Sequence, residues 1–235
     1  VDPQAAALDD EALDRGELQG FRLAAGREVP GRAALGVAQQ SDVRILHLQQ
    51  RQIHPAAQQG DEADPDGDLL DLGGGAGTNA IAFCQVYPDL HATVFDLQET
   101  LKLTEKTVKE AGLESRITLH PGDFNRNPLG GPYDVVLMSD ILHYQTFDMN
   151  QDLVKKVYGA LASGGRLVIK DRFLDEAGTG PAWTTAFAVH ILVNTQKGSC
   201  FQASEAMQWL HAAGFGSVVE LEKTAVVQGV KSRET

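Results

Sequence analysis

The stretch LLDLGGGAGTNAIAF, residues 69–83, decides the fold class of this chain. A short apolar run comes first, four glycines follow within residues 73–77, and a helix-forming run completes the stretch. A strand, a glycine-rich turn and a helix in this order form the ligand site of open α/β sheets. Glycine lets the backbone approach a bound molecule closely, and the turn lies at the carboxyl end of its strand.

From residue 67 onward, expected strands alternate with expected helices, which predicts a Rossmann-like α/β fold with a doubly wound parallel sheet. The expected strands are 68–72, 91–96, 116–124, 133–140 and 164–171. The expected helices are 78–87, 97–112, 149–162, 181–195 and 204–215. We expect a terminal antiparallel pair of strands within 218–232, and we assign residues 67–235 to one domain.

Residues 1–66 differ in composition from the rest of the chain. They hold six Arg, nine Gln and no Lys, and Phe21 is the one aromatic residue among them. Such a segment buries little apolar surface against its ordering entropy. We expect a weak amphipathic helix at 7–25, a short strand or helical turn at 42–50, and a solvated linker at 58–68. The segment is therefore either a linker or a truncated helical, dimerising region.

The composition narrows the class of protein and of partner. The formal net charge is −12, and no run approaches the ~18 apolar residues of a membrane span. Because phosphate contacts need clustered Lys and Arg, we expect neither nucleic acid nor a membrane as partner. Cys84 and Cys200 are too few for a disulfide framework and lie outside any metal-like cluster. The first residues do not resemble a signal peptide, so we expect a reducing cytoplasm.

The glycine loop and the acids around it narrow the ligand. A P-loop is excluded because no Gly-Lys-Ser/Thr follows. The spacing Gly73-x-Gly75-x-Gly77 departs from the G-x-G-x-x-G of dinucleotide sites, which favours S-adenosylmethionine over a nicotinamide or flavin dinucleotide. Asp71 precedes the loop within the strand. Asp96 ends the next strand, 19 residues after Gly77, where a carboxylate can accept both ribose hydroxyls.

A third acid follows at the end of the third expected strand. Asp123 stands there with Phe124 beside it, a pair suited to the edge and the face of an adenine. Acids at the ends of three successive strands indicate one shared ligand site. The alternative is that Asp96 and Asp123 only form turns, as Asp often does.

Five stretches together resemble the class I S-adenosylmethionine-dependent methyltransferases. More narrowly, they resemble the small-molecule O-methyltransferases related to the plant caffeate and acetylserotonin enzymes and their bacterial counterparts. The stretches are DLGGGAGTNAIAF (71–83), ATVFDLQETL (92–101), RITLHPGDF (116–124), YDVVLMSDILH (133–143) and GALASGGRLVIKD (159–171). The resemblance covers residues 68–230. It implies a seven-stranded mixed sheet with an antiparallel last strand, S-adenosylmethionine as cofactor with S-adenosylhomocysteine as product, and no metal.

The resemblance also implies which residues bind the cofactor. The matching positions are Asp71, Gly73, Gly75, Gly77, Asp96, Leu97, Asp123 and Phe124. The first four belong to the methionine end, the next two to the ribose and adenine, and the last two to the adenine. Ser139 stands where the family often has a lysine, which removes one cation from the adenosine site.

A general base and an orienting acid are implied in the same way. A phenol with pKa ~10 is a poor nucleophile at neutral pH, and an imidazole with pKa ~6.5 suits the removal of its proton. His143 matches the family's base after the fourth strand, and Asp171 matches the first of two acids that orient it. A lone loop histidine with a structural hydrogen bond is the alternative for His143.

Two positions depart from the family's catalytic pattern. The second acid is missing, because the corresponding stretch reads Gly198-Ser199-Cys200-Phe201. Glu205 lies further on and is expected to be a first-turn acid of the following helix. Tyr144 stands where the family commonly has Asp. These departures concern catalysis and leave the cofactor motifs intact.

The acceptor pocket is expected along the helix at 181–195. Its candidate lining residues, spaced for one or two helix faces, are Trp183, Phe187, His190, Ile191 and Asn194. Core packing is the alternative for these side chains. In the family a preceding helical domain forms a homodimer and lines the partner's pocket, so the resemblance also implies a homodimer.

The resemblance implies methylation of a hydroxyl on a small, aromatic secondary metabolite. One alternative is a relative that binds S-adenosylmethionine without methylating, or that uses it for other chemistry, as the missing acid at Cys200 suggests. A nicotinamide-dependent oxidoreductase is a further alternative, which the glycine spacing disfavours.

Overall fold

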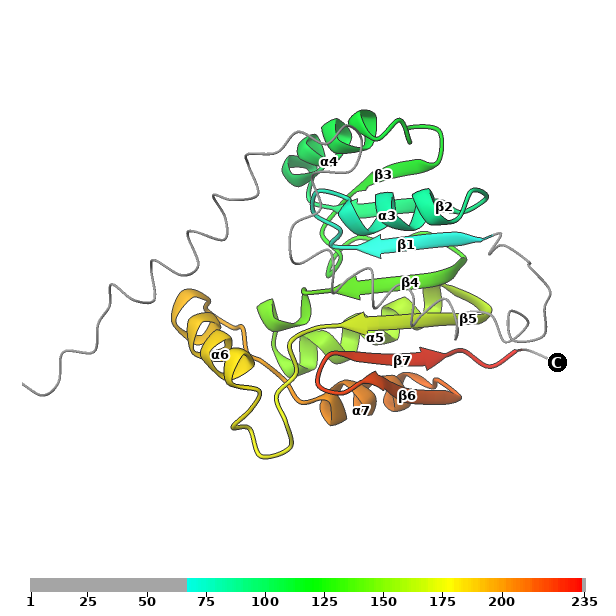
Figure 1. The fold of residues 1–235 in the computed structure, drawn as a ribbon. Coiled ribbons are helices and arrows are strands. Elements are labelled where there is room, and N and C mark those ends of the chain that lie inside the picture. The colour runs from blue at the N-terminus through cyan, green and yellow to red at the C-terminus, as the bar shows by residue number, and fades with distance from the viewer. Residues whose placement is uncertain (1–66, 234–235) are drawn as a thin grey trace, which may run out of the picture. The chain divides into compact units, whose positions relative to one another are not determined.

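Seven strands form one sheet in the order β3-β2-β1-β4-β5-β7-β6 in the computed structural model, which describes residues 67–233 (Figure 1). The strands are β1 (Asp68–Leu72), β2 (His91–Asp96), β3 (Ile117–Pro121), β4 (Tyr133–Ser139), β5 (Leu161–Lys170), β6 (Ser217–Glu222) and β7 (Val226–Val230). Strands β1 to β5 pair in parallel, and β7 is antiparallel to β5 and β6. The seven-stranded mixed sheet with an antiparallel last strand is therefore confirmed. The elements expected at 7–25 and 42–50 and nearly all of the linker at 58–68 lie outside the described residues.

Helices cover both faces of this sheet. The helices of the described residues are α3 (Thr78–Val86), α4 (Gln98–Glu110), the 3-10 turn η2 (Leu142–Tyr144), α5 (Phe147–Ala160), α6 (Ala182–Asn194) and α7 (Ala203–Ala213). Helix α3 contacts β1, β2 and β3 and helix α4 contacts β3, whereas α5 and α7 contact each other and the half of the sheet with β5, β6 and β7. Helix α6 lies beyond the carboxyl ends of the parallel strands (Figure 1). None of the helices in the described part of the chain combines the length and the apolarity that crossing a bilayer requires.

Three expected boundaries, the end of α5, the start of β5 and the end of β3, were wrong by a few residues, and hydrogen bonds explain each of them. Leu161 is extended and pairs with Tyr133, so α5 ends at Ala160 and β5 begins three residues earlier than expected. Strand β3 ends at Pro121 rather than at residue 124. Asp123 lies in the following turn, where its Oδ1 accepts the N–H of Asn125 at 2.9 Å.

The larger core cluster fixes the strand ends from which the site is built. Its buried side chains come from β1, β2, β4, β5, β7, α5, α7 and the segments between them, and include Trp209, Phe95 and Phe173, each at most 1% exposed. Burying one such side chain contributes roughly 1.5–3 kcal/mol. The core therefore holds β4 and β5 side by side, and the segments that follow them emerge next to each other.

Candidate active site

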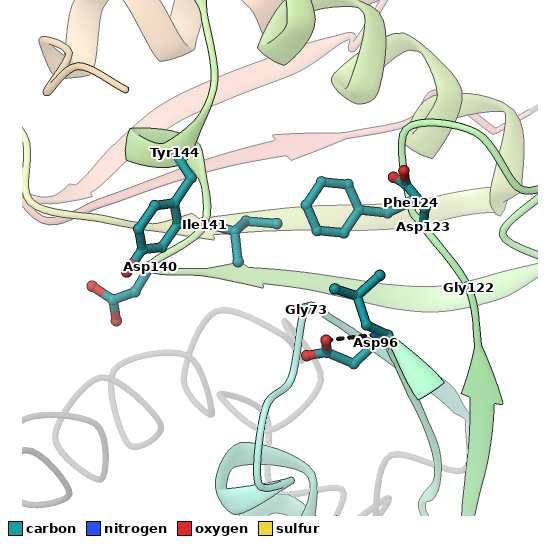
Figure 2. A pocket seen from close by; sticks show the side chains of 9 residues that line it. Gly73, Asp96, Gly122, Asp123, Phe124, Asp140, Ile141 and Tyr144 are labelled. Atoms are coloured by element: carbon teal, nitrogen blue, oxygen red, sulfur yellow. Dashed lines mark hydrogen bonds between the residues drawn. The ribbon is translucent and has the colours of Figure 1, made fainter. Parts of the chain in front are cut away.

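A cavity of about 370 Å³ opens at the carboxyl ends of the parallel strands (Figure 2). The residues that line it are Gly73, Asp96, Leu97, Gly122, Asp123, Phe124, Asp140, Ile141 and Tyr144. Five of the eight residues that match the family's cofactor motifs are thus brought together around one space. The sequence did not single out Gly122, Asp140 and Ile141 as cavity residues, and the only local signal was their position directly after β3 and β4.

Asp96 connects the glycine loop to the cavity. Its Oδ2 accepts the N–H of Gly75 at 2.9 Å, and its Oδ1 accepts the N–H of Leu97 at 2.7 Å. Each carboxylate oxygen can accept more than one hydrogen bond, so both oxygens keep capacity for a pair of ligand hydroxyls. The contact with the loop is a structural role of Asp96, and its assignment to the ribose stays a prediction.

The glycines of the loop are needed for two different reasons. Gly73 has φ +71°, and a Cβ there would lie 2.7 Å from Cγ2 of Ile141, within the cavity wall. Gly77 has φ +75° and precedes α3, where a Cβ would lie 2.8 Å from Cγ2 of Thr104. The hydroxyl of Thr104 also donates to the carbonyl of Gly75 at 2.5 Å. Gly75 and Gly77 therefore shape the turn against α4, and the cavity lining includes neither of them.

Asp71 lies beneath the loop and also outside the cavity lining. It is fully buried, its Oδ2 accepts the N–H of Ala80 at 3.2 Å, and a Cβ on Gly74 would lie 2.7 Å from its Cγ. Burial raises the pKa of Asp71 to about 7, and the charge of Asp96 acts in the same direction. The position of Asp71 supports the loop, and its assignment to the methionine end stays a prediction.

Asp123 both forms a turn and lines the cavity. Its backbone N–H donates to Oδ1 of Asn127 at 2.8 Å, which, with the bond to Asn125, closes the turn after β3. The ring of Phe124 lies beside Ile141 in Figure 2. The two roles weighed for Asp123 are therefore compatible.

A cation lies beside the cavity although residue 139 is Ser. Ser139 lies outside the lining, and its hydroxyl donates to Oδ2 of Asp140 at 3.2 Å. Lys170 is the direct partner of Ser139 on β5, and its Nζ is 2.6 Å from the same oxygen. Arg172 Nη1 is 3.6 Å from the other carboxylate oxygen, Oδ1, which accepts no hydrogen bond within residues 67–233. This buried oxygen remains available to a donor on a bound ligand.

His143 and Asp171 form a buried pair next to this cavity. Nδ1 of His143 is 2.7 Å from Oδ1 of Asp171, and the two side chains are only 3% and 4% exposed. The carboxylate also accepts the N–H of Arg172 at 2.7 Å and the N–H of Leu142 at 3.0 Å. Because a carboxylate can only accept, Nδ1 carries the hydrogen and Nε2 is the nitrogen that can take up a proton. The two predicted catalytic residues are thus in contact.

The backbone around His143 is fixed as well. Nδ2 of Asn150 donates to the carbonyl of Leu142 at 3.1 Å, and the N–H of Ser199 donates to the carbonyl of His143 at 3.1 Å. Gln145 donates to Oδ1 of Asn150 at 2.9 Å. Asn150 was missed by the sequence analysis, because an Asn inside an expected helix carries no signal of this contact.

Asp140, His143 and Asp171 could in principle hold a metal ion, since their ligand atoms lie within 4.8 Å of one another. The ammonium group of Lys170 already lies against Asp140, and the guanidinium of Arg172 is close to it. Positive charges at these oxygens oppose a further cation. The arrangement therefore favours a network of ion pairs over a metal centre.

Helix α6 contributes Phe187 to the surroundings of His143. The two rings meet edge to face with 4.9 Å between their centres. The ring of Tyr144 also contacts the imidazole, with 4.3 Å between the ring centres. Tyr144 also lines the cavity, so one ring touches both the cavity and the imidazole.

None of the other acceptor candidates on α6 lines the cavity. Trp183 is 62% exposed, and Ile191 is buried in the core. Asn194 is exposed and donates to the carbonyl of His190 at 2.9 Å, a contact within the last turn of the helix. The core-packing alternative is therefore correct for Ile191, whereas a substrate role for Trp183, His190 and Asn194 stays a prediction.

The two departures from the family pattern have clear structural outcomes. Cys200 is buried, and burial, with Asp171 nearby, raises the pKa of its thiol to about 11, so it is neutral at physiological pH. Glu205 accepts the N–H of Gln202 at 2.7 Å in a capping box of α7, which confirms its role at the start of the helix. Neither residue is hydrogen-bonded to His143 among the described residues, whereas Asp171 is.

Known proteins of similar sequence and fold are methyltransferases. A family model described as an O-methyltransferase domain matches residues 61–216. The 3-hydroxy-5-methyl-1-naphthoate 3-O-methyltransferase of Streptomyces sahachiroi is 32% identical over 169 residues, which are 70% of this chain and 49% of that protein. The L-tyrosine C(3)-methyltransferase of Streptomyces lavendulae is 34% identical over 148 residues, or 63% of this chain and 40% of that protein. The chain thus spans about half the length, or less, of these curated relatives.

Among solved structures, the apo form of the S-adenosylmethionine-dependent methyltransferase SibL superposes with a TM-score of 0.64 at 29% identity. The match covers 91% of this chain and 62% of that one. The same fold therefore occurs in a larger protein whose remaining part has no counterpart in the match.

Proposed function

Since the chain belongs to the O-methyltransferase family, we propose that it transfers a methyl group from S-adenosylmethionine to a hydroxyl of a small aromatic compound, with His143 as general base. One observation carries this proposal. The ring of Tyr144 lines the cavity and also contacts the imidazole of His143, so a single side chain joins the cavity to the base. Methyl transfer is an in-line displacement that depends on such proximity.

The residues around the cavity fit this cofactor. Asp96 keeps acceptor capacity for a ribose diol, Phe124 offers an aromatic face, and the buried Oδ1 of Asp140 can accept a donor. The close approach of the loop at Gly73 excludes a side chain from the cavity wall. When bound, S-adenosylmethionine supplies a methyl group on a positively charged sulfonium, which makes that carbon electrophilic.

The base acts on the acceptor. Nε2 of His143 takes the hydroxyl proton as the oxygen attacks, and Asp171 stabilises the imidazolium through Nδ1. The hydrogen bonds that hold Leu142 and His143 keep the imidazole in place during this step. A deprotonated phenol is nucleophilic at oxygen and at the adjacent ring carbons, and one relative is named for methylation of a tyrosine carbon. We propose oxygen as the acceptor atom because the family model that matches residues 61–216 is described as an O-methyltransferase domain.

Calorimetry with S-adenosylhomocysteine and transfer of a labelled methyl group to a library of phenols test the proposal. We expect the wild type to bind S-adenosylhomocysteine and to label one or more phenols. His143→Ala is expected to keep that affinity and to lose ~10²–10⁴-fold in transfer rate. His211→Ala, an exposed histidine of α7, is the matched control and is expected to change neither quantity. Mass spectrometry of the product separates O- from C-methylation, and an unchanged rate in His143→Ala contradicts the base assignment.

A second candidate function is cofactor binding without methyl transfer. The neutral thiol of Cys200, at the position of the family's second acid, favours it. Binding of S-adenosylhomocysteine with no labelled product in the library would support this candidate. Thermal stabilisation by NAD instead of S-adenosylhomocysteine would support the oxidoreductase alternative.

A further inference from the structure

Arg172 is placed by the same carboxylate that holds the base. Its backbone N–H donates to Oδ1 of Asp171 at 2.7 Å, and its side chain then turns toward α6, where Cζ lies 4.4 Å from the centre of the Phe187 ring. The side chain is 37% exposed. Arg172 therefore brings a guanidinium to the rim of the site, on the side of the base where α6 lies.

The guanidinium and the imidazole contact one ring. His143 meets Phe187 edge to face at 4.9 Å, and Arg172 lies over the same ring at 4.4 Å. Consider an aromatic acceptor whose hydroxyl contacts Nε2 of His143. The far side of its ring system then lies one or more ring widths from that nitrogen. The guanidinium, which shares the Phe187 ring with the imidazole, is the group that a second substituent of this ring system would meet on the side of α6.

The guanidinium of Arg172 is only partly neutralised by the acidic side chains around it. Nη1 of Arg172 is 3.6 Å from Oδ1 of Asp140, which is longer than a hydrogen bond. This oxygen accepts no hydrogen bond within the described residues. Lys170 already lies 2.6 Å from the other oxygen of Asp140. The Asp171 side chain is directed at His143 and at two backbone N–H groups. The guanidinium thus keeps donors for an anionic ligand, and its planar fork matches a carboxylate.

We propose that Arg172 selects the acceptor, and that the acceptor is a hydroxyarene carrying a carboxylate on the same ring system. This inference rests on the proposed methyl transfer and adds the substrate class. Arg172 is a specificity-determining residue and takes no part in the proton transfer. A purely structural role, in which Arg172 only supports Asp140 and Phe187, predicts equal effects on neutral and anionic acceptors.

Matched acceptors separate these two roles. The chain saturated with S-adenosylhomocysteine is titrated with a panel of hydroxynaphthoates and with the naphthols that lack the carboxylate, and kcat/KM is measured for the same compounds. The variants are Arg172→Gln, which removes the charge, and Arg172→Lys, which keeps it without the fork. Lys109→Gln, an exposed cation of α4, is the control for net charge.

We expect the wild type to bind one or more hydroxynaphthoates at least ~10-fold more tightly than the matching naphthol. Arg172→Gln is expected to remove that preference while the naphthol affinity changes less than about twofold, and Arg172→Lys to keep part of it. Equal losses for both acceptor classes, or no preference in the wild type, overturn the proposal. If methyl transfer occurs but is independent of Arg172, this inference alone fails. If the chain neither binds S-adenosylhomocysteine nor methylates any compound, the proposed function fails, and this inference fails with it.

Discussion

Nδ1 of His143 lies 2.7 Å from Oδ1 of Asp171, and the two residues, 28 positions apart in the chain, meet at the ends of neighbouring strands. Both side chains are almost completely buried. A hydrogen bond to a carboxylate orients the ring and fixes which of its nitrogens carries the hydrogen. The contact is the structural basis for assigning the base, and it leads to the first of four predictions.

Asp171→Asn tests the orientation of the base. An asparagine amide can present N–H groups to Nδ1, which favours the wrong tautomer and leaves Nε2 protonated. We expect the methyl transfer rate to fall by ~10²–10⁴-fold while the affinity for S-adenosylhomocysteine changes less than about twofold. Asp148→Asn, an exposed acid at the start of α5, is the control. A loss of rate below about threefold would show that the carboxylate does not orient the base.

Asp96→Ala tests the cofactor site. The substitution removes both the acceptor expected at the ribose and the hydrogen bonds to Gly75 and Leu97. We expect the affinity for S-adenosylhomocysteine, measured by calorimetry, to fall by ~10–100-fold, since hydrogen bonds to charged groups contribute about 1.5–3 kcal/mol. Asp134→Ala removes a carboxylate that accepts a backbone N–H, that of Asp68, at the other end of the sheet. If both variants bind equally well, the ribose assignment is wrong.

Gly77→Ala tests the close packing of the loop on α4. The new methyl group meets Thr104 at 2.8 Å, and the residue has φ +75°. We expect the free energy of unfolding in urea to fall by about 2–4 kcal/mol, from conformational strain and overpacking together. Gly75→Ala, with φ +56° and open space around it, measures the strain alone and is expected to be milder by about 1–2 kcal/mol. Equal effects of the two substitutions would indicate that Thr104 moves aside.

Asp71→Asn tests the buried acid beneath the loop. The folded pKa of about 7 lies above the unfolded value of 3.8, so the native state binds the proton more tightly. The contribution of Asp71 to stability is therefore fully present below pH 4 and is lost as the pH rises from about 4 to 7. A neutral Asn does not lose this contribution. We therefore expect the difference in unfolding free energy, Asp71→Asn minus wild type, to be ~1–3 kcal/mol more favourable to the variant at pH 8 than at pH 4.5.

Urea unfolding at the two pH values measures this difference, with the exposed Asp89→Asn as control. A gap between wild type and Asp71→Asn that stays constant with pH would mean that Asp71 remains charged in the fold throughout this range.

Much of the fold could be predicted because its signals are local. Each strand that leads into the cavity is a short apolar run, and β1 and β2 have the bounds that were expected. Asp96 and Asp123 follow strands that lie side by side, so a parallel sheet brings them to the same edge. The boundaries of α5 and β5 were less accurate because the pairing of Leu161 with Tyr133 on β4 decided them, and β3 ends early because Asp123 forms the turn that follows it.

The sequence by itself determined the order of strands and helices, the glycine loop, and the acids at the strand ends. These follow from periodicity and from the conformational preferences of single residues. Only the tertiary structure decided that Lys170 lies beside Ser139, that Tyr144 joins the cavity to His143, and that Arg172 and His143 contact the same ring of Phe187. Those contacts depend on the register between β4 and β5 and on the packing of α6. The pattern of polar and apolar residues along the chain encodes neither of these.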